Sequence, residues 1–377
     1  MLCGLIFFYH EKIGELVLNT KLAKSRCGEP CCWHLFEKPI IPKDAIHSKT
    51  NVCRHFRAGN MHQQPNHVFH VATTNQPEKV QFSLHFERVG TIGKVCQGNS
   101  FFFGTQQQTP PTRVANDYEF SHLGDVKISQ TCSVLVTCDE GTKRILFHDL
   151  QTHQHKRTLQ TPDVPHCLCI ETESGCDFLY YSSHYHVYKF NLNQLVSADC
   201  CEPVWRSGEF THSLLQQQGS RPKMNQFHHA QGLAVCHSKM VFNACESIDE
   251  NVLLVCDQTQ FEVKIVRCTT GQVIGRFDVS AGQCLMKGGG PVGIVVNSKG
   301  NLIIIDQGVK LYGKKDNGNV IVCDCGNSRI VVLDENGTFI KEYRGVSGES
   351  FNPKGVCIDT RTGYLYIAER TRIQVYK

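Results

Sequence analysis

The 377-residue sequence lacks the features that define several large classes of protein. No stretch approaches the roughly 18 apolar residues that a membrane-spanning helix needs. The formal net charge is only +4; residues 1–117 carry 13 basic and 8 acidic side chains, and residues 118–377 carry 26 and 27. This balance argues against a broad phosphate-binding face. The sequence therefore predicts no membrane partner, and it disfavours nucleic acid as a ligand.

Motifs of nucleotide chemistry and of nucleophilic catalysis are also missing. There is no nucleophile elbow, no kinase signature and no pair of Cys-x2-Cys knuckles. The glycine run Gly288-Gly289-Gly290 precedes a strand-like segment rather than a helix, so we interpret it as a connection and not as a phosphate loop. The sequence accordingly predicts no catalytic residue and no cofactor.

Cysteine, in contrast, is abundant. The 21 cysteines are odd in number, and several lie within apolar, strand-like runs, where a thiol behaves as a small hydrophobic side chain. Scattered buried thiols suit a reducing compartment better than a disulfide framework does. The run from Leu5 to Tyr9 is too short for a signal sequence and lacks a basic leader. We therefore expect a cytoplasmic protein.

Self-similar segments recur along most of the chain. Residues 320–343 read VIVCDCGNSRIVVLDENGTFIKEY, which is three strand-like runs separated by Asp/Asn/Gly turns. Residues 252–277, 134–159 and 364–377 repeat this order, and lead-in strands of the type PVGIVV precede the repeats. A period of roughly 40–45 residues with four short strands is typical of propeller blades. The sequence therefore predicts an all-β propeller with four-stranded blades.

The amino-acid sequences of these repeats closely resemble those of one family. The phrases PVGIVV at 291–296, GNLIIID at 300–306 and GNSRIVV at 326–332 are similar to the NHL repeat. The resemblance extends over approximately residues 86–377 and implies a propeller of six blades, with five as the alternative. It also implies a protein that offers its loop faces to partners.

Two details of the ring follow from the repeats. The last repeat ends without an outer strand, so we expect residues 80–88 to pair with residues 372–377 and to close the ring. The propeller would then span residues 80–377, behind an irregular extension at 1–79. The phrase Gly-Asn-apolar occurs twice, at Gly300 and Gly318, so 300–320 is either two fused incomplete blades or a blade with an insertion.

An acidic residue follows the second strand of most repeats. Because a catalytic group is needed only once, its recurrence favours a structural role in which the carboxylate holds turn amides and a neighbouring Asn or Arg. The residues that we assign to these turns are Asp139, Asp257, Asp306, Asp324, Asn327, Arg329 and Glu369.

Metal-binding residue types occur in two places. The amino-terminal extension offers seven candidate ligands with irregular spacing, which makes it a weak zinc candidate and a degenerate version of the zinc modules that precede many NHL domains. These ligands are Cys27, Cys31, Cys32, His34, His47, Cys53 and His55. Within the repeats, His184 and His186 alternate along the chain, and His228 and His229 precede a lead-in strand. Some propeller enzymes, including amidating lyases, hold a metal on histidines from several blades, but their ligand motif has no counterpart that we can place in this sequence.

The function that the sequence favours is a non-catalytic scaffold that binds protein partners through a loop face. Three alternatives stay open: a metal-dependent propeller enzyme of the lyase or lactonase type, a protein of the ubiquitin-ligase type with a degenerate zinc module, and an RNA-binding NHL domain.

Overall fold

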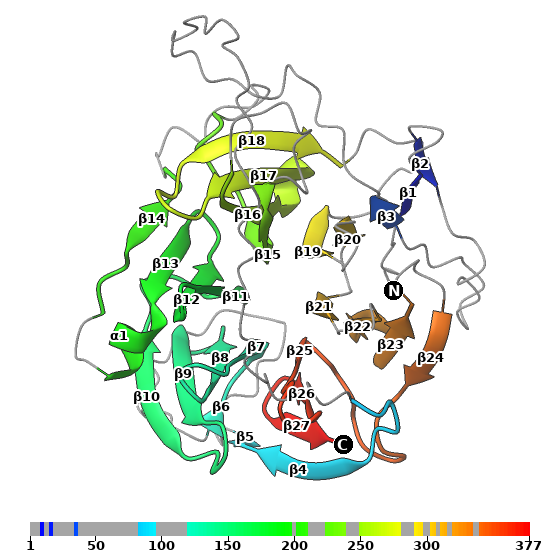
Figure 1. Cartoon of the computed structure of the whole chain (residues 1–377). Coiled ribbons are helices and arrows are strands. Elements are labelled where there is room, and N and C mark those ends of the chain that lie inside the picture. Colours follow the sequence, from blue (N-terminus) through cyan, green and yellow to red (C-terminus); the bar gives the residue numbers. More distant parts are fainter. Residues whose placement is uncertain are drawn as a thin grey trace, which may run out of the picture.

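Six sheets stand around a common centre in the computed structural model (Figure 1). The structure describes residues 82–95, 119–197, 201–209, 223–238, 249–279, 290–296, 302–306, 310–314, 319–334 and 339–377, together with three short strands near the amino terminus. Five of the sheets are four-stranded, antiparallel blades. The described residues therefore form an all-β propeller with five four-stranded blades, which is the alternative count rather than the expected six.

The first three blades follow one another directly in the sequence. The first consists of β7 (Leu123–Ser129), β8 (Val134–Asp139), β9 (Arg144–Asp149) and β10 (His155–Gln160). The second consists of β11 (Cys167–Glu173), β12 (Cys176–Ser182), β13 (Val187–Asn191) and β14 (Trp205–Ser207), with helix α1 (Leu192–Ser197) before β14. The third consists of β15 (Ala230–His237), β16 (Asn251–Asp257), β17 (Glu262–Arg267) and β18 (Val273–Asp278).

A mixed sheet follows the third blade. The hairpin of β19 (Pro291–Val296) and β20 (Leu302–Asp306) pairs with β3 (His34–Phe36), which is joined to β1 (Phe8–His10) and β2 (Glu15–Val17). The Gly-Asn phrase at Gly300 precedes β20, whereas the one at Gly318 precedes β22 of the next blade. The two Gly-Asn motifs therefore belong to two successive sheets. Part of the segment 300–320, which could have been an insertion, forms strand β21.

Two further blades complete the ring. One consists of β21 (Lys310–Lys314), β22 (Val320–Asp324), β23 (Arg329–Leu333) and β24 (Phe339–Tyr343). The last consists of β25 (Gly355–Ile358), β26 (Leu365–Ala368), β27 (Ile373–Tyr376) and, from the other end of the chain, β4 (Arg88–Ile92). A short parallel pair, β5 (Lys94–Val95) with β6 (Glu119–Phe120), leads from β4 to the first blade.

The ring closes slightly later in the sequence than residues 80–88. Strand β4 pairs with β27 so that Gly90 faces Val375 and Ile92 faces Ile373. The preceding apolar residues serve a different purpose. Phe82 and Phe86 are buried, and the Phe86 ring stacks on Tyr343 with 4.5 Å between ring centres. These two phenylalanines anchor the segment against the neighbouring blade before the closing strand begins.

Burial of apolar side chains between neighbouring sheets holds the ring together. Between the first two blades, for example, Val136 and Phe147 of one blade pack with Leu179 and Phe190 of the other. Each such side chain contributes about 1.5–3 kcal/mol when it leaves water. No helix in the described part of the chain is long and apolar enough to cross a membrane. The cysteines of the described residues are free thiols, and Cys236, Cys256, Cys323 and Cys357 lie in these cores.

Candidate metal site on one face of the propeller

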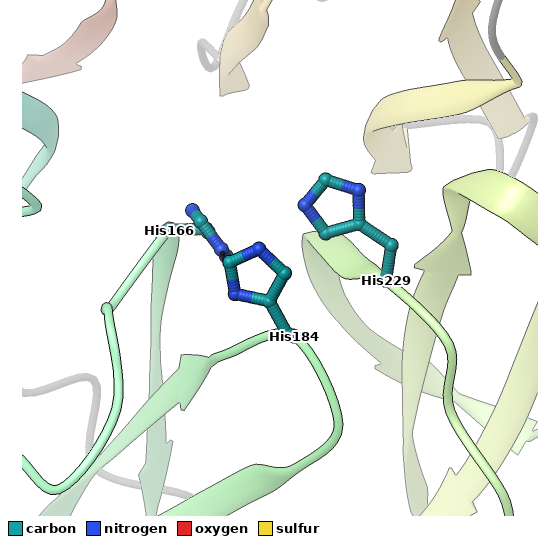
Figure 2. A group of neighbouring side chains, drawn as sticks. All are labelled: His166, His184 and His229. Atoms are coloured by element: carbon teal, nitrogen blue, oxygen red, sulfur yellow. Dashed lines mark hydrogen bonds between the residues drawn. The ribbon is translucent and has the colours of Figure 1, made fainter. Parts of the chain in front are cut away.

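Three histidines converge at one end of the ring (Figure 2). His166 directly precedes β11, His184 lies two residues beyond the end of β12, and His229 directly precedes β15. Inner strands begin and second strands end at the same edge of their blades, because neighbouring strands are antiparallel. Residues that are distant in the sequence therefore share this face. We call His166, His184 and His229 the histidine cluster.

The backbone of the cluster is fixed by hydrogen bonds within and between blades. The amide of His166 donates to the carbonyl of Ser182 over 2.9 Å, and the carbonyl of His184 accepts from the amide of Ala230 over 3.0 Å. The second bond joins the second and third blades beside the cluster. The Asp257 carboxylate accepts the amide of His229 over 3.1 Å. The positions of the imidazoles thus follow from the repeat itself.

The three imidazoles are close enough together to bind one metal ion. One nitrogen of each histidine lies within 4.8 Å of the corresponding nitrogens of the other two. His166 Nε2 and His184 Nδ1 are 3.1 Å apart, and the rings of His184 and His229 are stacked with 4.6 Å between their centres. The shorter contact is a hydrogen bond between the two rings, and the tautomers decide which ring donates.

The surroundings favour uncharged imidazoles. Burial lowers the pKa of His184, and the neighbouring His166 lowers it further. Burial, followed by repulsion from His166 and His184, lowers the pKa of His229 to about 4. Neutral imidazole is the form that binds metal ions. His184 and His229 consequently offer lone pairs rather than positive charges at neutral pH.

A carboxylate lies behind the cluster. Glu140, at the end of the second strand of the first blade, places Oε1 3.4 Å from His166 Nδ1 and Oε2 3.4 Å from His122 Nδ1. His166 thus has Glu140 at one ring nitrogen and His184 at the other. A carboxylate on the far nitrogen orients a metal-binding imidazole and raises its basicity. On the other side, Gln231 Nε2 lies 2.8 Å from His229 Nε2.

The acidic residues that recur in the repeats lie beside this face and hold its turns. Asp139 accepts the amide of His122 over 2.8 Å, and Asp257 binds the buried Lys264 as well as the amide of His229. Asp324 accepts from Asn327 Nδ2 over 2.9 Å and from Arg329 Nε over 2.7 Å. Glu369 accepts from Arg372 Nε over 2.5 Å and from Gln374. Asp306 ends β20, and its side chain lies outside the described residues.

The sequence singled out two members of the histidine cluster and missed the third. His184 and His229 belong to it, whereas His186 faces Asp163, with 3.4 Å between His186 Nδ1 and the carboxylate. His166 was overlooked because its blade is the most diverged of the repeats. Aligning the lead-in strands would have found it, since His122, His166 and His229 all directly precede an inner strand.

The amino-terminal candidates for zinc ligands lie outside the described part of the chain. This applies to Cys27, Cys31, Cys32, His47, Cys53 and His55, and to the side chain of His34, whose backbone belongs to β3.

The fold and the cluster define a β-propeller protein with a candidate three-histidine metal site. No family model matches the sequence, and no curated protein matches it. Among solved structures, the chain is similar to streptogramin B lyase, with 12% sequence identity and a TM-score of 0.41 over 69% of this chain and 96% of that chain.

Proposed function

We propose that the chain binds a divalent transition metal, zinc by its donor set, on His166, His184 and His229, and that it acts as a metal-dependent propeller enzyme. The observation that carries the proposal is the approach of one nitrogen from each of three imidazoles to within 4.8 Å of the others. This is the alternative that the sequence left beside the scaffold. NHL-type repeats remain a prediction for the blades.

The donor set favours a catalytic rather than a structural type of site. Structural zinc is closed by four protein ligands, whereas catalytic zinc has three protein ligands and one open position that holds water or substrate. Zinc bound in this way lowers the pKa of its water to about 7 and polarises carbonyl groups. The reaction class that we propose is therefore hydrolysis or elimination at a carbonyl-activated substrate.

The cluster must contract to hold the ion. Three nitrogens bound tetrahedrally at about 2.0–2.1 Å from zinc lie roughly 3.3 Å from one another. The separation of 3.1 Å between His166 and His184 already meets this requirement. His229 has to turn about its side-chain bonds, which releases its contact with the Gln231 amide.

Cobalt titration of the full chain tests the metal site. We expect one cobalt ion per chain to bind with the weak visible bands of a nitrogen-ligated site, and this ion to be lost in His166→Asn and in His184→Asn. His186→Asn is the matched control, because His186 occupies the same loop as His184 but faces Asp163. Cobalt bound by cysteine would instead show an intense thiolate charge-transfer band and would indicate the amino-terminal segment. Unchanged binding in both cluster variants would refute the proposal.

A scaffold function is the second candidate, and one observation favours it. Val89, Phe339, Ile340 and Val346 are exposed by 38–46% although they are large and apolar. Phe339 and Ile340 lie on β24, the outer strand of its blade, and Val89 lies on the outer strand of the next blade. Exposed apolar groups on outer strands suit a protein partner. If Phe339→Ser with Ile340→Ser abolishes partner binding while cobalt binding persists, the two functions are separate.

A further inference from the structure

A pocket of about 500 Å³ lies between the first and last blades. It is lined by the β7–β8, β9–β10 and β25–β26 loops and by the closing strand β4. The β7–β8 and β25–β26 loops follow inner strands, whereas the histidine cluster lies where inner strands begin. The pocket and the cluster therefore occupy opposite faces of the propeller. A volume of this size falls within the usual range for small-molecule sites.

The wall of the pocket is apolar and aromatic. Val89 and Val375 come from the two strands that close the ring, and Leu150 comes from the first blade. Tyr364 and Tyr366 supply two aromatic rings from the last blade. Such a wall binds a ring-shaped apolar body by dispersion and by removal of water.

The polar groups of the pocket have a defined distribution of charge. Arg361 is the cation among the lining residues, and its guanidinium also donates to the carbonyl of Gln130 over 3.1 Å. The Asp359 carboxylate is buried and engaged by the Arg361 amide, by Thr362 Oγ1 and by Gln130 Nε2. Its charge is thus stabilised inside the turn. The guanidinium remains exposed and can contact an anionic group on a ligand.

His153 adds a directional polar contact. Its Nε2 lies 3.3 Å from the hydroxyl of Tyr366, which places a polar pair within the pocket. His153 has a φ of +57°, a left-handed conformation that is uncommon for residues other than glycine. The corresponding turn of the third blade has Gly271 at a φ of +73°.

We infer that this pocket binds a small aromatic carboxylate, with its ring between the tyrosines and the apolar wall and its carboxylate on Arg361. His153 and Tyr366 would contact a polar substituent on the ring. Because β4 contributes Val89 and Gly90 to the pocket, the ligand also bridges the strand that closes the ring. Bound ligand should therefore stabilise the closed propeller against unfolding.

Saturation-transfer NMR on the full chain tests the inference with benzoate, 4-hydroxyphenylacetate and indole-3-acetate, and with the corresponding amides as uncharged probes. We expect at least one acid to bind and its amide to bind more weakly. Arg361→Gln should weaken binding by about tenfold or more, as for loss of a charge-assisted hydrogen bond. Arg344→Gln is the matched control, because Arg344 pairs with Glu342 on β24, away from the pocket.

Two further variants separate binding from folding. Gly90→Leu should fill the pocket without disturbing β4, since a Cβ at this position would meet Val375 at an ordinary 3.8 Å. His153→Gly should raise the melting temperature while it weakens binding. Absence of binding for all three acids, or binding that neither Arg361→Gln nor Gly90→Leu reduces, would overturn the inference.

Discussion

Replacement of Lys264 by methionine should destabilise the propeller strongly. Lys264 and Asp257 are fully buried, and Lys264 Nζ lies 2.5 Å from Asp257 Oδ2. The ammonium also donates to the carbonyl of Gln226 and lies 4.9 Å from the centre of the Phe227 ring. Methionine fills a similar volume but leaves the Asp257 carboxylate buried without its counter-ion.

The expected loss can be derived from the burial of the pair. Removal of one partner of a buried ion pair costs about 3–5 kcal/mol, because the remaining charge is uncompensated. For a domain of this size, such a loss lowers the melting temperature by roughly 5–15 °C. Part of the charge on Asp257 is still stabilised by the amides of His228 and His229. We therefore expect a value in the lower half of this range.

A double-mutant cycle provides the measurement. Asp257→Asn retains an oxygen for the histidine amides but removes the charge, so the double variant with Lys264→Met should be more stable than the sum of the single losses predicts. Thermal and urea unfolding, followed by circular dichroism, give the three free energies. If the single losses simply add, the ion pair does not determine the stability of this turn, and our account of how the repeat holds His229 is incorrect.

Two other predictions concern the pH dependence and the turns. Burial lowers the pKa of His153, against a smaller opposite effect of Asp149, so the unfolded chain takes up a proton that the folded chain does not take up as the pH falls below about 6.5. The stability of the parent should thus decrease more steeply between pH 7 and pH 5 than that of His153→Gln; parallel curves would contradict this. Gly290→Ala should destabilise by more than Gly175→Ala, since both have a positive φ but only at Gly290 would a Cβ clash, at 1.8 Å from the Gln258 carbonyl oxygen.

Much of the architecture could be predicted because it depends on local repeats. The turn residues and the apolar runs between them define each hairpin, and groups of four short strands recur with a fixed period. The position of the ring closure was less accessible. Phe82 and Phe86 form an apolar pattern that resembles a strand, whereas in the structure Phe86 packs on Tyr343 and Tyr376, and Phe82 packs on Phe86. The sequence pattern alone does not distinguish apolar residues that belong to a strand from apolar residues that precede the strand and pack against a neighbouring blade.

The candidate site could be predicted only in part, because it combines residues of two blades. The β11–β12 hairpin brings His166 and His184 together, and His229 joins them only through the packing of the third blade against the second. The pocket at the first and last blades is still less accessible, since Gly90 and Val375 come from opposite ends of the chain. Both sites depend on long-range pairing, which local propensity does not encode.

The position of the cluster suggests how one backbone can carry different chemistry in each blade. The acidic residue at the end of the second strand accepts hydrogen bonds from backbone amides and pairs with cations, as Asp257 does with the amide of His229 and with Lys264. We therefore expect a substitution there to destabilise the turn. The residue that follows it is Glu140, Gln258, Cys325 or Arg370; in the second blade, where Ser183 stands in place of the acid, it is His184. Because the turn stays fixed while this neighbour varies, side chains on one face can change one at a time without loss of the fold. We therefore expect the chemistry of the propeller to depend on two positions in each blade: the residue after the turn residue that ends the second strand, and the residue before the inner strand. The histidine cluster contains both kinds of position, His184 of the first kind and His166 and His229 of the second.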